Sequence, residues 1–220
     1  MRLAPSALCV LLASSALAQD SLDLAPLKKW ILLQKELRTL EADFVQTRSL
    51  RTLRSPVAVP GKLWFNSGGD LHWELGNPPK TIFLRNKEGS FLIHPQKLRY
   101  ETIAIDKAAP GAPQNFPMLE FPIASSFGDF CNQFEVTKIK TEGAQCHLEF
   151  IPKEAQARKY VQTIRLDFET QTGELQFLEF VSRDGSSLKT EFSNVRTNRK
   201  LDNAVFAFDL NGYRADSPKP

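Results

Sequence analysis

The stretch GKLWFNSGGDLHWEL, residues 61–75, decides the fold of this chain. On either side of the turn sequence SGGD, large apolar residues alternate with others: Leu63 and Phe65 precede the turn, and Leu71 and Trp73 follow it. Alternation with a period of two is typical of strands, and glycines between two such runs are typical of a tight turn. The stretch therefore predicts an antiparallel hairpin with one apolar face.

The same alternation recurs along most of the chain, and glycine-containing or proline-containing turns separate the runs. The predicted strands cover residues 61–65, 71–75, 81–86, 90–94 and 97–102, and strands resume at Phe134. We expect about ten or eleven strands in all, and an antiparallel sheet of that size has to curl or split.

Two segments depart from the strand pattern. Residues 24–40 carry apolar side chains on a period of about 3.6, with Pro26 in the first turn, which predicts a helix followed at once by a strand. Residues 116–123 are apolar but twice interrupted by proline, which suits short helical turns better than sheet. The pattern predicts a mainly β fold: an incomplete antiparallel β-barrel, or half-barrel, covered by an N-terminal helix and a short helical lid. The covered space is either a core or a pocket.

The start of the chain has the pattern of an export signal. Residues 1–18 are almost uncharged and end in a small-x-small triplet at 16–18, which predicts a cleaved signal peptide followed by a single domain over residues 19–220. Beyond the leader only Cys131 and Cys146 remain, in a chain that would mature in an oxidising space. We expect a disulfide between them, and the alternative is two buried, reduced thiols.

The composition argues against several classes of function. With 28 basic and 25 acidic side chains, the net charge of +3 is too small to indicate nucleic-acid binding. The sequence has no nucleophile elbow, no zinc-binding helix motif and no phosphate-binding glycine loop, and His72, His94 and His147 are isolated. We therefore expect no enzyme, no metal site and no cofactor.

A series of short motifs follows a fixed order over nearly the whole mature chain. The motifs are LRTLEADFVQT at 37–47, GKLWF at 61–65, LHWE at 71–74, PP at 78–79, FIP at 150–152, TGEL at 172–175, and Asn194 with FAF at 206–208. In this order and spacing the chain resembles the LolA-type outer-membrane lipoprotein carriers.

The resemblance implies a periplasmic, monomeric carrier without catalysis. Such a protein takes acylated lipoproteins from an inner-membrane ABC-type lipoprotein release complex, shelters their acyl chains in an apolar trough, and passes them to an outer-membrane acceptor. By strand parity and family position, the candidate trough residues are Phe44, Leu63, Phe65, Leu71, Trp73, Phe83, Phe91, Phe150, Leu166 and Phe168. The candidate lid contacts are Met118, Leu119 and Phe121. For each of them, the alternative is ordinary core packing.

One position departs from the family pattern. Members commonly place an arginine about six residues before the strand tryptophan, where it helps to fasten the lid, and the matching position here is Ser67. Arg85 or Arg99 would have to replace it. Without the arginine that fastens the lid, a second binding function remains open: the protein would carry another lipid or a glycolipid. A third is an envelope-stress sensor module, which we expect to carry a further domain or tether that this sequence lacks.

Overall fold

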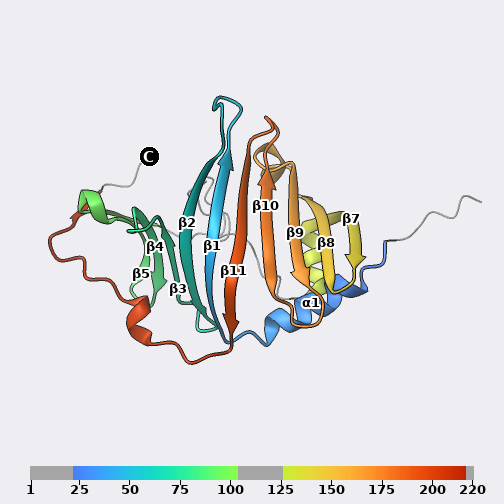
Figure 1. Ribbon diagram of the computed structural model, residues 1–220, viewed down its shortest axis with the longest axis horizontal. Coiled ribbons are helices and arrows are strands. Elements are labelled where there is room, and N and C mark those ends of the chain that lie inside the picture. The colour runs from blue at the N-terminus through green and yellow to red at the C-terminus, as the bar shows by residue number, and fades with distance from the viewer. Residues whose placement is uncertain (1–21, 104–125, 217–220) are drawn as a thin grey trace, which may run out of the picture.

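The computed structural model describes residues 22–103 and 126–216, and these fold around one sheet of 12 strands (Figure 1). The strand order is β12-β6-β5-β4-β3-β2-β1-β11-β10-β9-β8-β7, and every pair is antiparallel except β12 with β6. The elements are α1 (Ala25–Lys35), β1 (Thr39–Ser49), β2 (Val57–Asn66), β3 (Leu71–Leu75), β4 (Thr81–Asn86), β5 (Gly89–His94), β6 (Arg99–Thr102), α2 (Phe127–Gln133), β7 (Phe134–Glu142), β8 (Gln145–Pro152), β9 (Thr163–Glu169), β10 (Leu175–Val181), β11 (Ser187–Thr197) and β12 (Arg214–Ala215), with 3-10 turns at Pro95–Lys97, Ala157–Lys159 and Asn203–Phe206. The sheet curls without closing, which confirms the mainly β, incomplete-barrel prediction.

The first helix is shorter than its apolar period predicts. It ends at Lys35 instead of continuing to residue 40. The reason is that the backbone of Arg38 already bonds to the sheet: its N–H donates to Asn198 Oδ1 at 2.7 Å, and its carbonyl accepts from the N–H of Ser67 at 2.7 Å. Because both backbone groups of Arg38 are used in these bonds, the helix cannot continue through Arg38, and β1 begins at Thr39.

Strand β10 contains the irregularity that decides which of its side chains face inward. Leu175 pairs with Phe168, but the next pair is Phe177 with Asp167, so one extra residue lies on β10. This bulge shifts the alternation by one position. Leu175 and Leu178 therefore lie on the same inner face, although simple parity would separate them.

The inner face of the sheet carries two separate apolar clusters. The first, under α1 and α2, contains Leu27, Trp30, Ile31, Phe130, Cys146, Leu148, Phe150, Ile164, Leu166, Phe168 and Leu178. The second, on β1–β5, contains Phe44, Leu63, Leu71, Trp73, Phe83 and Leu92. Both are made from alternate residues of their strands, as one buried face requires.

The two cysteines belong to the first cluster and are not bonded to each other. Cys146 is fully buried on β8, and Cys131, on α2, is half-buried and packs against the same cluster. Both are free thiols in the structure, so the expected disulfide is not formed there. Burial raises the pKa of the Cys146 thiol, which is consistent with a small apolar packing role.

The end of the chain covers the outer face of β3–β5, and we call residues 202–216 the C-terminal strap. Its carbonyls at Val205 and Phe206 accept hydrogen bonds from His72 Nδ1 and Asn86 Nδ2, and β12 then pairs with β6. Under the strap lies a third cluster of Ile82, Leu84 and Ile93, with Phe91, Tyr100, Phe208, Leu210 and Tyr213 packed against it. Strands β4 and β5 are therefore buried on both faces.

Two sequence predictions fall outside the described residues. They are the signal peptide at 1–18 and the lid contacts Met118, Leu119 and Phe121. Within the described ranges, no helix is long and apolar enough to cross a bilayer.

Candidate ligand-binding cavity

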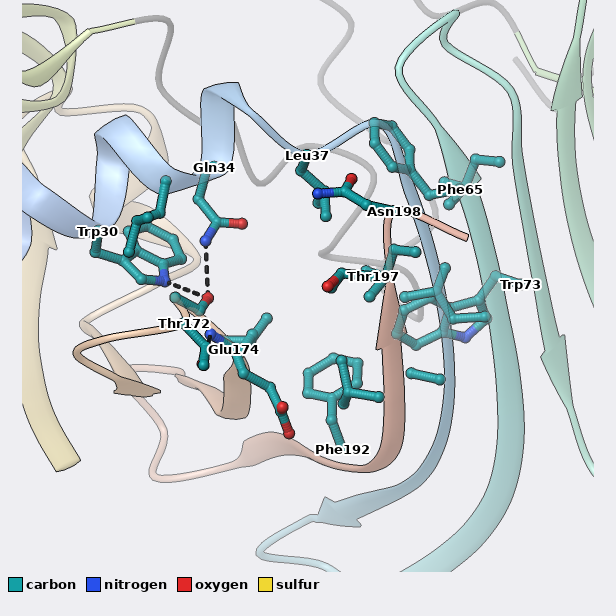
Figure 2. Close-up of a pocket in the computed structure, with 18 of the residues that line it drawn as sticks. Trp30, Gln34, Leu37, Phe65, Trp73, Thr172, Glu174, Phe192, Thr197 and Asn198 are labelled. Carbon is teal, nitrogen blue, oxygen red and sulfur yellow. Dashed lines mark hydrogen bonds between the residues drawn. The ribbon is translucent and has the colours of Figure 1, made fainter. Parts of the chain in front are cut away.

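A cavity of about 360 Å³ lies between the C-terminal end of α1 and the inner face of the sheet (Figure 2). It separates the two inner clusters, because Trp30 of the first forms one wall and Trp73 of the second forms the opposite wall. The lining residues are Trp30, Leu33, Gln34, Leu37, Leu40, Ala42, Leu63, Phe65, Leu71, Trp73, Arg85, Thr172, Gly173, Glu174, Leu175, Phe192, Val195, Thr197 and Asn198.

The helix wall is fixed to the turn between β9 and β10 through a single carbonyl. Trp30 Nε1 and Gln34 Nε2 both donate to the carbonyl oxygen of Gly173, at 3.1 Å and 2.8 Å (Figure 2). Gly173 has a φ of +75°, and an added Cβ there would lie 2.9 Å from Cβ of Leu33. Only glycine allows the helix to approach this closely while the turn keeps its shape.

The sheet wall is supported by a group of three aromatic rings in mutual contact. Trp73 lies with its ring centroid 4.2 Å from that of Phe44, and Phe192 of β11 meets both rings edge-on at 6.2–6.4 Å. The Phe44 ring in turn lies over Gly61 of β2, where an added Cβ would come within 2.1 Å of it. These large, mutually supported rings give the cavity a rigid apolar floor.

Two charged residues line the cavity, Arg85 and Glu174. Arg85 is half-buried on β4, and its Nε donates to the carbonyl oxygen of Gly69 at 2.7 Å. Burial lowers the pKa of its guanidinium, and the nearby Asp70 carboxylate opposes that shift. An arginine remains protonated despite such a shift, so the apolar cavity has a cation in its wall.

Four of the ten predicted trough residues line the cavity, namely Leu63, Phe65, Leu71 and Trp73. Phe44 and Phe83 are buried behind them in the second cluster. Phe150, Leu166 and Phe168 lie in the first cluster beneath α1 and do not line this cavity, so they are core residues.

Phe91, predicted as a trough residue, lies on the outer face of the sheet. It pairs with Leu84 and packs under the C-terminal strap, whereas the neighbouring pair of Phe83 and Leu92 faces inward. Parity alone could not show this, because β5 is apolar on both sides and the strap that buries its outer face comes from the far end of the sequence.

Most of the helix wall, the turn and the β11 wall are absent from the candidate trough residues of the sequence. Trp30, Gln34 and Leu37 do lie on the predicted apolar stripe of the first helix, so a signal for that wall was present. The turn residues Thr172 and Glu174 belong to the TGEL motif at 172–175, but nothing in that motif indicates that the turn lines a cavity. Among the described residues, no group of three or more histidine, cysteine or acidic side chains is placed to hold a metal ion.

The family comparison covers most of the chain. Residues 35–209 match the family described as outer membrane lipoprotein carrier protein LolA. The chain belongs to the LolA family. No match was found among the curated protein sequences.

Several solved structures are similar to this chain at very low sequence identity. An uncharacterized conserved protein from Thermus thermophilus has a TM-score of 0.52 at 4% identity, over 87% of this chain and 97% of that one. The complex of Pseudomonas aeruginosa MucA and MucB gives 0.50 at 10% identity, over 88% of this chain and 62% of that one. A LolA superfamily protein from Nitrosomonas europaea gives 0.42 at 8% identity, over 83% and 96%.

The LolA assignment makes the position of the two alternative latch arginines relevant. Arg85 lines the cavity. Arg99 lies on β6, next to the edge strand β12, and its Nε is 3.1 Å from Asp216 Oδ1 of the C-terminal strap. Of these two arginines, Arg85 lies in the cavity wall and Arg99 does not.

Proposed function

We propose that this protein is a periplasmic carrier that holds the acyl chains of lipoproteins in the cavity and moves them from the inner to the outer membrane. The observation that supports this most directly is an apolar cavity in a chain of the LolA family. Each methylene group that leaves water for an apolar site gains about 0.8 kcal/mol, so a long acyl chain needs such a shelter to cross an aqueous space. The partners would be a release complex in the inner membrane and an acceptor in the outer membrane.

The arrangement of the cavity also suits reversible binding. One wall is a helix held to the sheet by the Trp30 and Gln34 bonds to Gly173, by packing of Trp30 on Phe168 with ring centroids 5.2 Å apart, and by buried Leu27 and Ile31. A ligand chain that enters between this helix and the sheet replaces apolar contacts with other apolar contacts. The net free energy of binding is then much smaller than the full transfer energy, which lets the carrier release its cargo.

A carrier of another lipid is the second candidate. Ser67 stands where the family commonly has its lid arginine, and Arg85 places a cation in the cavity wall. A phospholipid or glycolipid with an anionic headgroup would pair with that cation while its chains fill the apolar part.

The test is native mass spectrometry of the protein with a triacylated cysteine lipopeptide, with the same peptide lacking acyl chains, and with phosphatidylglycerol. Leu37 lines the cavity, and Leu32 is 55% exposed on α1, so Leu37→Glu and Leu32→Glu make a matched pair. We expect an equimolar adduct with the acylated peptide for the wild type and for Leu32→Glu. For Leu37→Glu, the amount of adduct should fall by about tenfold or more, because a charged side chain would enter the apolar cavity.

Equal binding of the acylated and unacylated peptides would exclude the acyl-chain site. Retention of phosphatidylglycerol with no lipopeptide adduct would favour the second candidate. Circular dichroism of both variants establishes that the comparison is made between folded proteins.

A further inference from the structure

Two hairpins form a projecting tip at the end of the sheet opposite α1 (Figure 1). The first is the connection between β1 and β2, residues 50–56, and the second is the turn between β10 and β11, residues 182–186. They are in contact, because a Cβ added to Gly185 would lie 3.8 Å from Cδ of Arg51. We call these two segments, with the flanking Arg48 and Val57, the hairpin tip.

The hairpin tip is strongly basic. Arg48, Arg51 and Arg54 lie on the first hairpin, and the sequence contains no acidic residue between Asp43 and Asp70. Arg183 adds a fourth cation on the second hairpin.

The single acid of the tip, Asp184, is engaged within it. Its carboxylate accepts from the N–H and hydroxyl of Ser186 at 2.9 Å and 3.0 Å. These bonds lower the pKa of Asp184, and Arg51 contributes in the same direction. The outward charge of the tip is therefore positive.

The tip also exposes large apolar side chains between its arginines. Leu53 is 45% exposed and Val57 is 49% exposed, and Leu50 is half-buried. The backbone holds Leu53 in a tight turn through its N–H, which donates to the carbonyl of Leu50 at 3.0 Å. An ordered, exposed leucine among cations is the pattern of a segment that lies at a lipid interface.

We propose that the hairpin tip docks the protein on the surface of an anionic phospholipid bilayer. The arginines pair with lipid phosphates, and Leu53 enters the boundary between headgroups and acyl chains. A bilayer suits the tip better than a protein partner does, because the tip projects as a narrow, convex end of the sheet and combines arginines with exposed apolar side chains.

The docking surface is separate from the cavity. Leu63 lines the cavity and lies six residues along β2 from Val57 of the tip, so about 20 Å of strand lies between them. Substitutions in the tip should therefore change membrane association and leave the filling of the cavity unchanged.

The experiment is sedimentation with vesicles of phosphatidylcholine alone and of phosphatidylcholine with about a third phosphatidylglycerol, at about 0.05 M and about 0.5 M salt. The test variant is Arg51→Glu with Arg54→Glu. The control is Lys28→Glu with Lys29→Glu, which makes the same change in net charge at exposed positions of α1. A third variant, Leu53→Ser, removes the apolar contact alone.

We expect the wild type and the lysine control to bind the anionic vesicles at low salt and to bind weakly at high salt. The double arginine variant should lose binding by about tenfold or more, and Leu53→Ser should weaken binding while keeping the salt dependence. Absence of wild-type binding to anionic vesicles, or an equal loss in the lysine control, would overturn the proposal. The lipopeptide adduct of the arginine variant, measured in parallel, tests the cavity function independently.

Discussion

At the scale of single residues, Gly61 controls the aromatic floor of the cavity. An added Cβ there would lie 2.1 Å from Cζ of Phe44 and 2.3 Å from the backbone carbonyl oxygen of Glu74. Since the carbonyl cannot move without breaking the sheet, Gly61→Ala should destabilise the protein by about 3 kcal/mol in urea unfolding. The control is Gly128→Ala in α2, where the nearest atom, Ser126 Oγ, is 3.7 Å away and the change should stay within about 1 kcal/mol.

Glu169 should give the turn that holds α1 a dependence on pH. The hydroxyl and backbone N–H of Thr172 bond to its carboxylate and lower its pKa, and the backbone N–H of Gln171 also donates to it. Because the folded pKa is depressed, this stabilisation is present above the unfolded pKa of about 4.3 and is lost as the pH falls through the folded pKa.

The measurement is the urea midpoint of Glu169→Gln against that of the wild type. We expect a lower midpoint for the variant at neutral pH and a difference that shrinks as the pH falls below about 4.3. Glu36→Gln, at an exposed residue outside the turn, is the control for loss of one charge. A difference that grows in acid would contradict this account of the turn.

At the scale of elements, the sequence predicts the strands well because each strand carries its own alternation. All the predicted strand segments before residue 103 are present, and their hairpin partners are the expected neighbours. The end of the helix is less predictable, because the backbone of Arg38 bonds to Ser67 and Asn198 and not within the helix, and both partners are distant in the sequence.

The inward face of a strand is harder to predict from the local sequence than the strand itself, because it depends on which other segments cover each face. In β10 a bulge between Leu175 and Phe177 changes the parity, and nothing in the local sequence marks it. In β5 both faces are apolar, so Phe91 could be placed only with knowledge of the strap. The candidate site was therefore predictable on its β2–β3 wall, where the inner face is uniformly apolar and the other face mixes Trp64 with Lys62, His72 and Glu74, and much less so elsewhere.

The C-terminal strap should matter for stability and not for ligand binding. Phe206 is buried beside the outer face, and its carbonyl accepts from Asn86 Nδ2 at 2.9 Å. Phe206→Ala should destabilise the protein by about 3–5 kcal/mol in urea unfolding, and Leu98→Ala, at a residue that is 55% exposed, should cost far less. If folded Phe206→Ala lost the lipopeptide adduct as Leu37→Glu does, the strap would have to be counted as part of the site.

At the scale of the whole molecule, the cavity exists because the two inner clusters do not merge. Helix α1 packs on β8–β10 through Trp30 and Phe168, and the aromatic floor of Phe44, Trp73 and Phe192 lies on β1, β3 and β11. Phe192 is partly buried, contacts both clusters and lines the cavity between them. A single continuous core would be denser and would leave no room for a ligand. The sequence could not predict this gap, since each cluster by itself follows the pattern of an ordinary sheet core.

The gap predicts that filling it will stabilise the empty protein and block its ligand. Ala42 lines the cavity from β1, so Ala42→Leu adds apolar volume there, and Ala58→Leu adds the same volume at an exposed position of β2. We expect Ala42→Leu to gain on the order of 1 kcal/mol and a higher thermal midpoint without ligand, and to lose most of the midpoint increase that the acylated lipopeptide gives the wild type. Ala58→Leu should change neither value. A lower midpoint for Ala42→Leu would mean that the added side chain meets a packed wall, because an overpacked core loses stability where an empty cavity gains it.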